Sequence, residues 1–271
     1  MVNFNRIEEK FLQLKKSHQG ALICYVVGGY PDVKSSIDII TSLVHGGADI
    51  IEIGIPFSDP IADGTVIQKA STIALSNHVT PDTCLELATI IRKRFPELPL
   101  LFMTYSNILL RQGFKRFMML SKTAGIDGFI IPDLTIEEAT DYLKFAQHLN
   151  LATIFLVSPN TSEQRIRKIS ESSKGFIYLV SVYGITGMRE SFDRHTTDMI
   201  KTVKQITNNN NIAVGFGISD RSHVKLMIDA GADGVIVGSA IVNLIGNERT
   251  GLKKRMFSYA NLLKKACKLQ Q

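Results

Sequence analysis

The sequence predicts an α/β fold, a (β/α)8 barrel, from a repeated alternation of strands and helices. Eight short runs rich in Ile and Val recur along the chain, with helical patterns between them. Most of these runs are apolar at both alternating sets of positions, as expected for parallel strands that are covered on both faces. The predicted strands cover residues 21–27, 49–55, 98–104, 127–131, 152–157, 176–182, 212–216 and 234–237.

Three similar joints between predicted helices and strands support the same architecture. Each joint ends a helix with glycine and opens a strand with aspartate, and glycine accommodates the left-handed turn that terminates a helix. Repeated joints indicate repeated βα units, and eight such units close most simply into a barrel. The joints are Gly47-Ala48-Asp49, Gly125-Ile126-Asp127 and Gly231-Ala232-Asp233.

An open, doubly wound sheet is the alternative architecture. Such a sheet usually has a glycine-rich fingerprint after its first strand, whereas Gly28-Gly29-Tyr30-Pro31 is typical of a turn. A length of 271 residues also suits one barrel, since these domains run to about 250 residues. We therefore expect a single barrel domain over residues 1–271, with an N-terminal helix and an extra helix in the loop after strand two.

Local signals also predict where several helices begin. Thr80-Pro81-Asp82 combines an N-cap residue with proline at the first helical position. Two other pairs, Thr135 with Glu138 and Thr161 with Gln164, have the spacing of a capping box.

Composition narrows the class of function. The formal net charge is +6, but the lysine pairs lie in helical patterns beside apolar residues and the chain has no Trp, which favours solvated helix faces over a nucleic-acid surface. No segment has the pattern of a signal peptide or a membrane span. The three cysteines are far apart, as in a reducing cytoplasm, and the six histidines lack metal-ligand spacing. We expect a cytoplasmic protein without a metal site.

Glu52 is the first candidate for chemistry. It lies within Ile50-Ile51-Glu52-Ile53, a predicted barrel strand with no exposed face, and strands one to three contain no Lys or Arg to pair with it. Desolvation raises the pKa of such a carboxylate towards values useful for proton transfer near neutral pH. The alternative is a structural glutamate paired with a cation from elsewhere.

The loop after this strand contains further acidic residues, Asp59 and Asp63. Ser-Asp-Pro and Asp-Gly are ordinary turn signals when taken singly. Next to a buried glutamate they gain a second interpretation, because two carboxylates in different environments can divide acid and base roles.

Glycines after the last two strands predict that the barrel is of the phosphate-binding type. Gly215-Phe216-Gly217-Ile218-Ser219 follows strand seven, and Gly238-Ser239-Ala240 follows strand eight. Barrels often bind phosphate there, where backbone N–H groups and a helix N-terminus face the oxygens. Gly184-Ile185-Thr186-Gly187, after strand six, predicts either a closing loop with a phosphate-facing end or a plain turn. Strand six has no lysine for a Schiff base.

These motifs together resemble one family. The run from Ile51 to Gly64, IEIGIPFSDPIADG, is similar to the signature of the tryptophan synthase alpha chain. Shorter matches occur in the same order along the chain: Gly29-Tyr30-Pro31, Tyr105-Ser106-Asn107, Pro132-Asp133-Leu134, Gly184-Ile185-Thr186-Gly187, Gly215-Phe216-Gly217-Ile218 and Gly238-Ser239.

The resemblance implies a lyase that cleaves indole-3-glycerol phosphate to indole and glyceraldehyde 3-phosphate, a retro-aldol step in L-tryptophan biosynthesis. By the same match Glu52 and Asp63 are catalytic, with Glu52 moving protons and Asp63 accepting the indole N–H. The expected substrate contacts are Tyr25, Met103, Ile130, Tyr178 and Thr186, and the expected phosphate ligands are Gly187, Phe216, Gly217, Gly238 and Ser239.

The resemblance also implies a partner. Alpha chains of the family assemble with a beta chain as an alpha-beta-beta-alpha heterotetramer; the beta chain holds pyridoxal phosphate, and no cofactor is expected in this chain. Pro56, Asp59 and Asn107 match positions at that interface. Two departures from the family pattern bear on loop closure: Thr65 replaces a usual proline, and Val182-Tyr183 is bulkier than expected.

Two other functions remain open from the sequence. One is a stand-alone indole-3-glycerol phosphate lyase that releases free indole from the same barrel. The other is a catalytically silent, phosphate-binding scaffold, against which the intact Glu52 and Asp63 argue.

Overall fold

The barrel is built from parallel strands in a single sheet. A computed structural model describes residues 5–181, 189–207, 210–215, 217–247 and 250–269. Neighbouring strands pair in the order β5-β4-β3-β2-β1-β9-β8-β7-β6. The strands are β1 (Ala21–Val27), β2 (Ile50–Gly54), β3 (Leu100–Met103), β4 (Gly128–Ile130), β5 (Ala152–Ile154), β6 (Leu156–Val157), β7 (Ile177–Val180), β8 (Ile212–Gly215) and β9 (Gly234–Val237).

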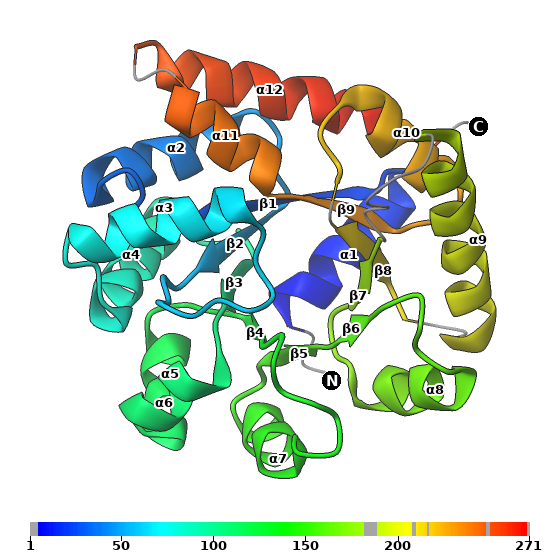
Figure 1. Cartoon of the computed structure of the whole chain (residues 1–271), viewed down its shortest axis with the longest axis horizontal. Helices are drawn as coiled ribbons and strands as arrows, with labels where there is room; N and C mark the ends of the chain where they lie inside the picture. The colour runs from blue at the N-terminus through cyan, green and yellow to red at the C-terminus, as the bar shows by residue number, and fades with distance from the viewer. Residues whose placement is uncertain (1–4, 182–188, 208–209, 216, 248–249, 270–271) are drawn as a thin grey trace.

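The fifth predicted strand closes the barrel. It is divided at Phe155 into β5, which pairs with β4, and β6, which pairs with β7. The Phe155 carbonyl accepts a hydrogen bond of 3.0 Å from the backbone N–H of Tyr178. One continuous stretch of chain therefore joins the two ends of the sheet, and the ring of strands is visible in Figure 1. The predicted barrel is confirmed, with its fifth strand interrupted.

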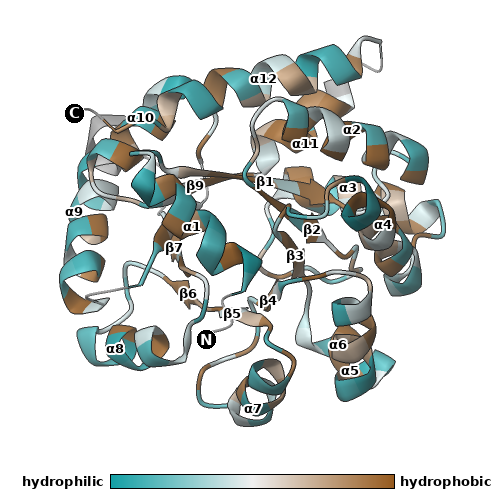
Figure 2. Cartoon of the chain, turned by 180° about the vertical axis from the view of Figure 1, so that it is seen from behind, coloured by the Kyte–Doolittle hydropathy of each residue, from teal (hydrophilic) through white to brown (hydrophobic). Residues whose placement is uncertain are grey.

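Helices surround this ring on its outer side (Figure 1), except for α1, which lies across the amino-terminal opening of the ring and faces the viewer in Figure 2. One helix, α1, precedes β1, and two helices, α3 and α4, separate β2 from β3. No helix in the described ranges is both long and apolar enough to cross a membrane. The helices are α1 (Arg6–Lys16), α2 (Val33–His45), α3 (Thr65–Ser76), α4 (Pro81–Arg94), α5 (Ser106–Gln112), α6 (Phe114–Thr123), α7 (Thr140–His148), α8 (Glu163–Ser172), α9 (Arg189–Thr207), α10 (Arg221–Asp229), α11 (Ser239–Asn247) and α12 (Leu252–Ala266).

One of the three predicted helix starts is confirmed. Thr80 caps α4 by accepting a 3.2 Å hydrogen bond from the Thr83 N–H, with Pro81 in the first turn. The prediction for Thr161 is wrong by one residue, because Ser162 is the N-cap of α8.

The prediction for Thr135 is also wrong. Its hydroxyl donates to Glu138 at 2.9 Å, but the next helix, α7, begins only at Thr140. For α8 the observed cap is the next residue in sequence, whereas α7 begins after Ala139, whose side chain makes no capping hydrogen bond.

The hydrophobic core lies on both sides of the sheet. Every residue of β1 and β2 is buried, and Figure 2 shows apolar strands inside helices whose colours alternate between apolar and polar. Outside the ring, Phe102, Phe117 and Phe129 join β3 and β4 to α6, with ring centroids 6.2 to 6.5 Å apart. Packing on both the inner and the outer face of the sheet fixes the strands, and the strands in turn fix the loops at their carboxyl ends.

The three glycine–aspartate joints lie at the amino ends of the strands. Gly47, Gly125 and Gly231 have φ of +108°, +92° and +104°, which confirms the predicted turn. Each following aspartate makes a reciprocal pair with one residue of the preceding strand: its N–H donates to that residue's carbonyl, and its side chain accepts from that residue's N–H. The side-chain bonds are Asp49 with Leu22 (2.8 Å), Asp127 with Leu100 (2.9 Å) and Asp233 with Ile212 (2.7 Å).

Each of these aspartates also pairs with a cation from the surrounding helices. Lys264 of α12 binds Asp49 at 2.7 Å, and Lys204 of α9 binds Asp233. Asp127 receives two arginines, Arg6 of α1 at 2.9 Å and Arg92 of α4 at 2.7 Å. The joints thus tie the strands to one another and to the outer helices at the end of the barrel opposite to the cavity described next.

Candidate active site

One cavity opens at the carboxyl ends of the strands and unites most of the predicted site. Its volume is about 550 Å³, and its walls come from β1, β2, β3, β4, β6, β7 and β9 with the loops that follow. Thr186, Gly187 and Phe216 lie outside the described residues. The other predicted catalytic, substrate and phosphate residues all line the cavity: Tyr25, Glu52, Asp63, Met103, Ile130, Tyr178, Gly217, Gly238 and Ser239.

Glu52 occupies the middle of β2 and faces this cavity. Its residue surface is 3% exposed, and within the described part of the chain its Oε2 atom has no hydrogen-bond partner. Burial, reinforced by the nearby Asp63 carboxylate, raises the pKa of Glu52 from 4.5 to about 8. At neutral pH the side chain is therefore mostly protonated, in the direction that the sequence predicts.

Asp63 enters the same cavity from the loop between β2 and α3. Its backbone is held locally, because its N–H donates to the Pro60 carbonyl at 3.0 Å and its carbonyl accepts from Gln68 Nε2 at 2.8 Å. Burial raises the pKa of Asp63 to about 6, and a hydrogen bond from the Tyr105 side chain opposes that rise. Near pH 7 the cavity therefore contains a mostly neutral Glu52 and a mostly ionised Asp63.

Tyr105 is a functional contact that the sequence reasoning missed. It is buried at the start of α5, its hydroxyl accepts from the Ala62 N–H at 3.2 Å, and its ring stacks on Phe57 at 5.1 Å. The loop after β2 is thereby tied to the loop after β3. The only sequence signal was the Tyr105-Ser106-Asn107 match, which does not reveal the contact with Asp63.

The loop after β4 supports α5 in turn. Asp133 accepts hydrogen bonds from the backbone N–H of Ser106 at 2.9 Å and from its hydroxyl at 2.6 Å. This carboxylate caps the first turn of α5 and so fixes the helix that positions Tyr105. Three consecutive loops therefore determine where Asp63 lies.

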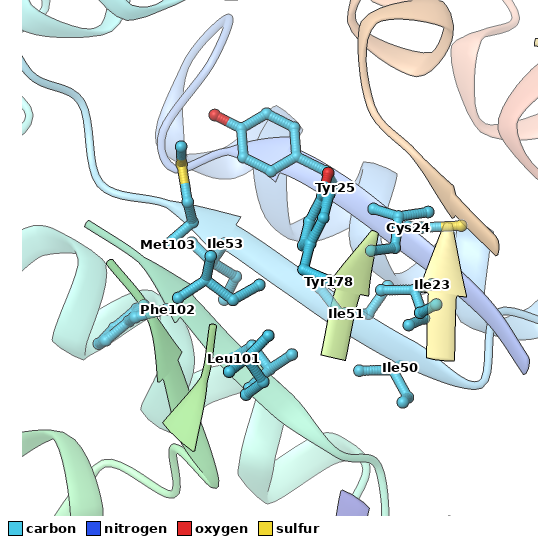
Figure 3. Close-up of a cluster of buried hydrophobic side chains, with 14 of the residues drawn as sticks. Ile23, Cys24, Tyr25, Ile50, Ile51, Ile53, Leu101, Phe102, Met103 and Tyr178 are labelled. Carbon is cyan, nitrogen blue, oxygen red and sulfur yellow. The ribbon is translucent and has the colours of Figure 1, made fainter. Parts of the chain in front are cut away.

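The wall beside the carboxylates is apolar and aromatic. Figure 3 shows Met103 and Tyr178 extending towards the same end of the barrel as the ring of Tyr25. Glycines make room for both tyrosines: a Cβ at Gly54 or at Gly215 would lie 2.2 Å from the hydroxyl oxygen of Tyr25 or Tyr178, respectively. A flat aromatic ligand fits against this surface, within reach of Glu52 and Asp63.

A second part of the cavity wall is formed by the loops after β8 and β9, next to the tyrosines. Gly217 has φ of +75°, a conformation that favours glycine, and Gly238 precedes α11, whose first residue is Ser239. A helix N-terminus next to glycines presents N–H groups to an anion. Among the cavity residues that the structure describes, none is Lys, Arg or His.

Across the described ranges, no group of three or more His, Cys, Asp or Glu side chains has an arrangement that could hold a metal ion. The polar groups that the described lining residues offer are two carboxyl groups, several hydroxyl groups, the side-chain amide of Asn243 and backbone dipoles.

Comparison with known proteins assigns the family. The family model described as tryptophan synthase alpha chain matches residues 11–269. The chain belongs to the tryptophan synthase alpha chain family. The tryptophan synthase alpha chain of Methanosarcina acetivorans is 44% identical over 259 residues, covering 96% of this chain and 93% of its own, and that of Prochlorococcus marinus is 42% identical over 245 residues, covering 90% and 91%.

A solved structure gives the same result. A chain in the aminoacrylate-bound crystal structure of tryptophan synthase from M. tuberculosis superposes with a TM-score of 0.87 at 32% identity, covering 97% of this chain and 99% of that chain. The fold and the family membership of this alpha chain are therefore established over almost its whole length.

The predicted partner residues of this family member differ in exposure. Asp59 and Asn107 are exposed, whereas Pro56 is buried beneath the loop. Two large apolar side chains stand out nearby in sequence, Ile61 at 82% exposed and Leu110 at 69%. The contacts of Tyr105 with Ala62 and Phe57 bring the loop after β2 next to the start of α5, so these exposed residues belong to adjacent segments.

Proposed function

We propose that this chain cleaves indole-3-glycerol phosphate to indole and glyceraldehyde 3-phosphate, as a carbon–carbon lyase and the alpha subunit of tryptophan synthase. The observation that supports this most strongly is the pair of carboxyl groups in one cavity, the buried Glu52 and the half-buried Asp63, whose pKa values are raised to about 8 and about 6. Family membership points to the same reaction.

The two walls of the cavity suit the two ends of this substrate. Tyr25, Met103 and Ile130 form the surface for the indole ring, and Tyr178 lies on the same side as the carboxylates. The phosphate belongs at the loops after β8 and β9, against Gly217, Gly238 and Ser239. We propose the remaining contacts from the family resemblance alone: Thr186 contacts the substrate, and Gly187 and Phe216 bind its phosphate.

Glu52 supplies the proton transfers of the retro-aldol step. In its neutral form it donates a proton to the ring carbon that bears the glycerol chain, which forms a new C–H bond and leaves a cationic ring. The bond from that carbon to the side chain then breaks, its electron pair returning to the ring. The resulting carboxylate accepts the proton of the adjacent side-chain hydroxyl as the aldehyde forms. Protons and electrons balance, and Glu52 returns to its neutral state.

Asp63 stabilises the charge that develops between these steps. Protonation of the ring carbon places positive charge on the indole nitrogen, and an ionised carboxylate that accepts its N–H stabilises that charge in a site of low dielectric constant. The lower pKa of Asp63 keeps it ionised while Glu52 is protonated, so each carboxyl group has the form that its role requires.

A beta chain is the proposed partner, in an alpha-beta-beta-alpha heterotetramer. Its docking surface on this chain comprises Asp59 and Asn107 with the exposed side chains of Ile61 and Leu110, since exposed apolar side chains are typical of protein interfaces. Pro56, which is buried, shapes the loop from beneath. Pyridoxal phosphate belongs to the partner, and the residues of this chain perform the cleavage without a cofactor.

The decisive experiment measures indole release from indole-3-glycerol phosphate by the purified chain, with and without a beta chain. We expect slow release by the chain alone and faster release in the complex. Full activity that a beta chain does not change would favour the stand-alone lyase. Binding of glycerol 3-phosphate without any cleavage, alone or in the complex, would favour the scaffold and exclude the proposed reaction.

A further inference from the structure

We infer that Asn243, in the second turn of α11, binds the phosphoryl group of the substrate through its side-chain amide. The inference rests on the proposed function, since it assigns one more contact to the phosphate end of that substrate. It extends the anion site from the backbone at the start of α11 to a side chain one turn further along the helix.

The position of Asn243 on α11 supports this assignment. Asn243 lines the cavity together with Ser239, Ala240 and Gly238. It lies four residues after Ser239 in the helix Ser239–Asn247, so the two side chains share one face. Helical side chains point back towards the N-terminus of their helix and cover the preceding turn. The carboxamide of Asn243 therefore extends towards Ser239 and the helix start, where the phosphate is expected.

The chemistry of the cavity gives this amide a distinct role. The described lining residues include hydroxyl groups, among them those of Thr65, Ser219 and Ser239, but Asn243 alone among them has a side-chain N–H donor. No other residue in the described part of the chain forms a hydrogen bond or an ion pair with its carboxamide. An exposed, unengaged donor at the mouth of the cavity is available for a ligand.

A neutral donor also suits the acid–base chemistry of the same cavity. A lysine or arginine at this position would favour ionisation of nearby carboxyl groups and lower the pKa of Glu52 and Asp63. An amide adds a hydrogen bond to the phosphate without a fixed positive charge. The same cavity can therefore bind a phosphate dianion and keep Glu52 protonated.

The test compares Asn243→Ala and Asn243→Asp with the wild-type chain by calorimetry, using glycerol 3-phosphate and indole as separate ligands. A hydrogen bond to a charged group contributes to affinity, and exposure at the cavity mouth reduces that contribution, so we expect Asn243→Ala to weaken glycerol 3-phosphate binding roughly 5- to 20-fold. Asn243→Asp should weaken glycerol 3-phosphate binding more, because its carboxylate repels the phosphate. This loss should grow between pH 6 and 8 as the phosphate gains its second charge. Indole affinity should not change.

Asn261→Ala serves as the matched control, because it removes the same side chain from α12, away from the cavity lining. Unchanged affinity for glycerol 3-phosphate in both Asn243 variants, in a chain whose wild type binds it, would overturn this inference and leave the proposed function intact. Equal weakening of indole and glycerol 3-phosphate would also overturn it, as a general distortion of the site. If the wild-type chain binds no glycerol 3-phosphate, the inference and the phosphate end of the proposed function fail together.

Discussion

The two ends of the barrel use carboxylates in opposite ways. At the amino ends of the strands, Asp49, Asp127 and Asp233 each accept a backbone N–H and pair with at least one cation. At the carboxyl ends, Glu52 and Asp63 face a cavity in which no described lining residue is basic. The same functional group therefore has a structural environment at one end and a chemically active one at the other.

The comparison shows that partners, and not burial alone, decide what a carboxylate does. A carboxylate that accepts a backbone N–H and pairs with a cation holds strands and helices together, and its removal would leave that cation without its partner. A carboxylate without a cation responds to burial by a raised pKa and can exchange a proton near neutral pH. Substitutions at the two ends should therefore separate stability from activity.

The largest expected effect is the loss of activity in Glu52→Gln. The amide retains the shape of the side chain but cannot transfer a proton, and such groups contribute roughly 10²- to 10⁴-fold to rate. We expect kcat for indole-3-glycerol phosphate cleavage to fall by that factor while affinity for the substrate remains within a few-fold. Retention of most of the wild-type kcat would remove Glu52 from the mechanism.

The same variant tests the energetic side of the comparison. Because the pKa of Glu52 in the folded chain is about 8, above its ordinary value of 4.5, the folded chain keeps a proton that the unfolded chain loses, and the fold becomes less stable as the pH rises from about 4.5 to 8. Glu52→Gln has no such penalty. Its melting temperature relative to wild type should therefore be higher at pH 8 than at pH 5, and an identical difference at the two pH values would contradict the buried, unpaired state of Glu52.

Asp127→Ala should show the reverse pattern. Its side chain is 2% exposed and holds Arg6, Arg92 and the backbone N–H of Leu100, and breaking a buried ion pair costs about 3–5 kcal/mol. At about 2–4 °C for each kcal/mol, the melting temperature should fall by roughly 6–20 °C. Below the transition, kcat should stay within a few-fold of wild type, because Asp127 lies at the end opposite to the cavity.

Asp141→Ala is the control for this variant, since Asp141 is an exposed aspartate at the start of α7. Its melting temperature should remain within a few degrees of wild type. If Asp127→Ala were as stable as this control, or inactive although folded, the amino end of the barrel would not serve stability alone, and the comparison between the two ends would be wrong.

The sequence predicted the fold well because its signals are periodic and local. Buried parallel strands are apolar at every position, and glycine–aspartate joints mark where strands begin, so the barrel follows from the pattern alone. The sequence also predicted the raised pKa of Glu52, because a strand buried on both faces desolvates any carboxylate that it contains. It did not predict that Asp49, Asp127 and Asp233 each find a cation, since Lys264, Arg92 and Lys204 come from distant helices.

The parts of the site that escaped prediction depend on contacts between loops. Tyr105 reaches Asp63 because the loops after β2 and β3 stack through Phe57, and no local pattern encodes that approach. Asn243 belongs to no motif in the sequence, and its place on the cavity wall follows from where α11 begins. The buried position of Pro56 likewise follows from loop packing, whereas a motif match conveys only its place in the sequence.

The smallest expected effect is a shift in the pH profile of Tyr105→Phe. If activity requires ionised Asp63 and neutral Glu52, kcat/KM of the wild type rises through pH 6 and falls through pH 8. The Tyr105 hydrogen bond lowers the pKa of Asp63, so its removal raises that pKa and moves the acidic limb to higher pH, while the basic limb stays in place. The substrate phosphate also titrates near pH 6, but equally for both enzymes.

Tyr142→Phe provides the matched control for this shift. The Tyr142 hydroxyl is buried in α7, outside the cavity, and has no hydrogen-bond partner among the residues that the structure describes. Its removal should leave both limbs of the profile unchanged. A joint shift of both limbs in Tyr105→Phe would mean that the loop after β2 moves as a whole. An acidic limb that coincides in Tyr105→Phe, Tyr142→Phe and wild type would show that Tyr105 does not govern the charge of Asp63, and the carboxyl end would then depend on burial alone.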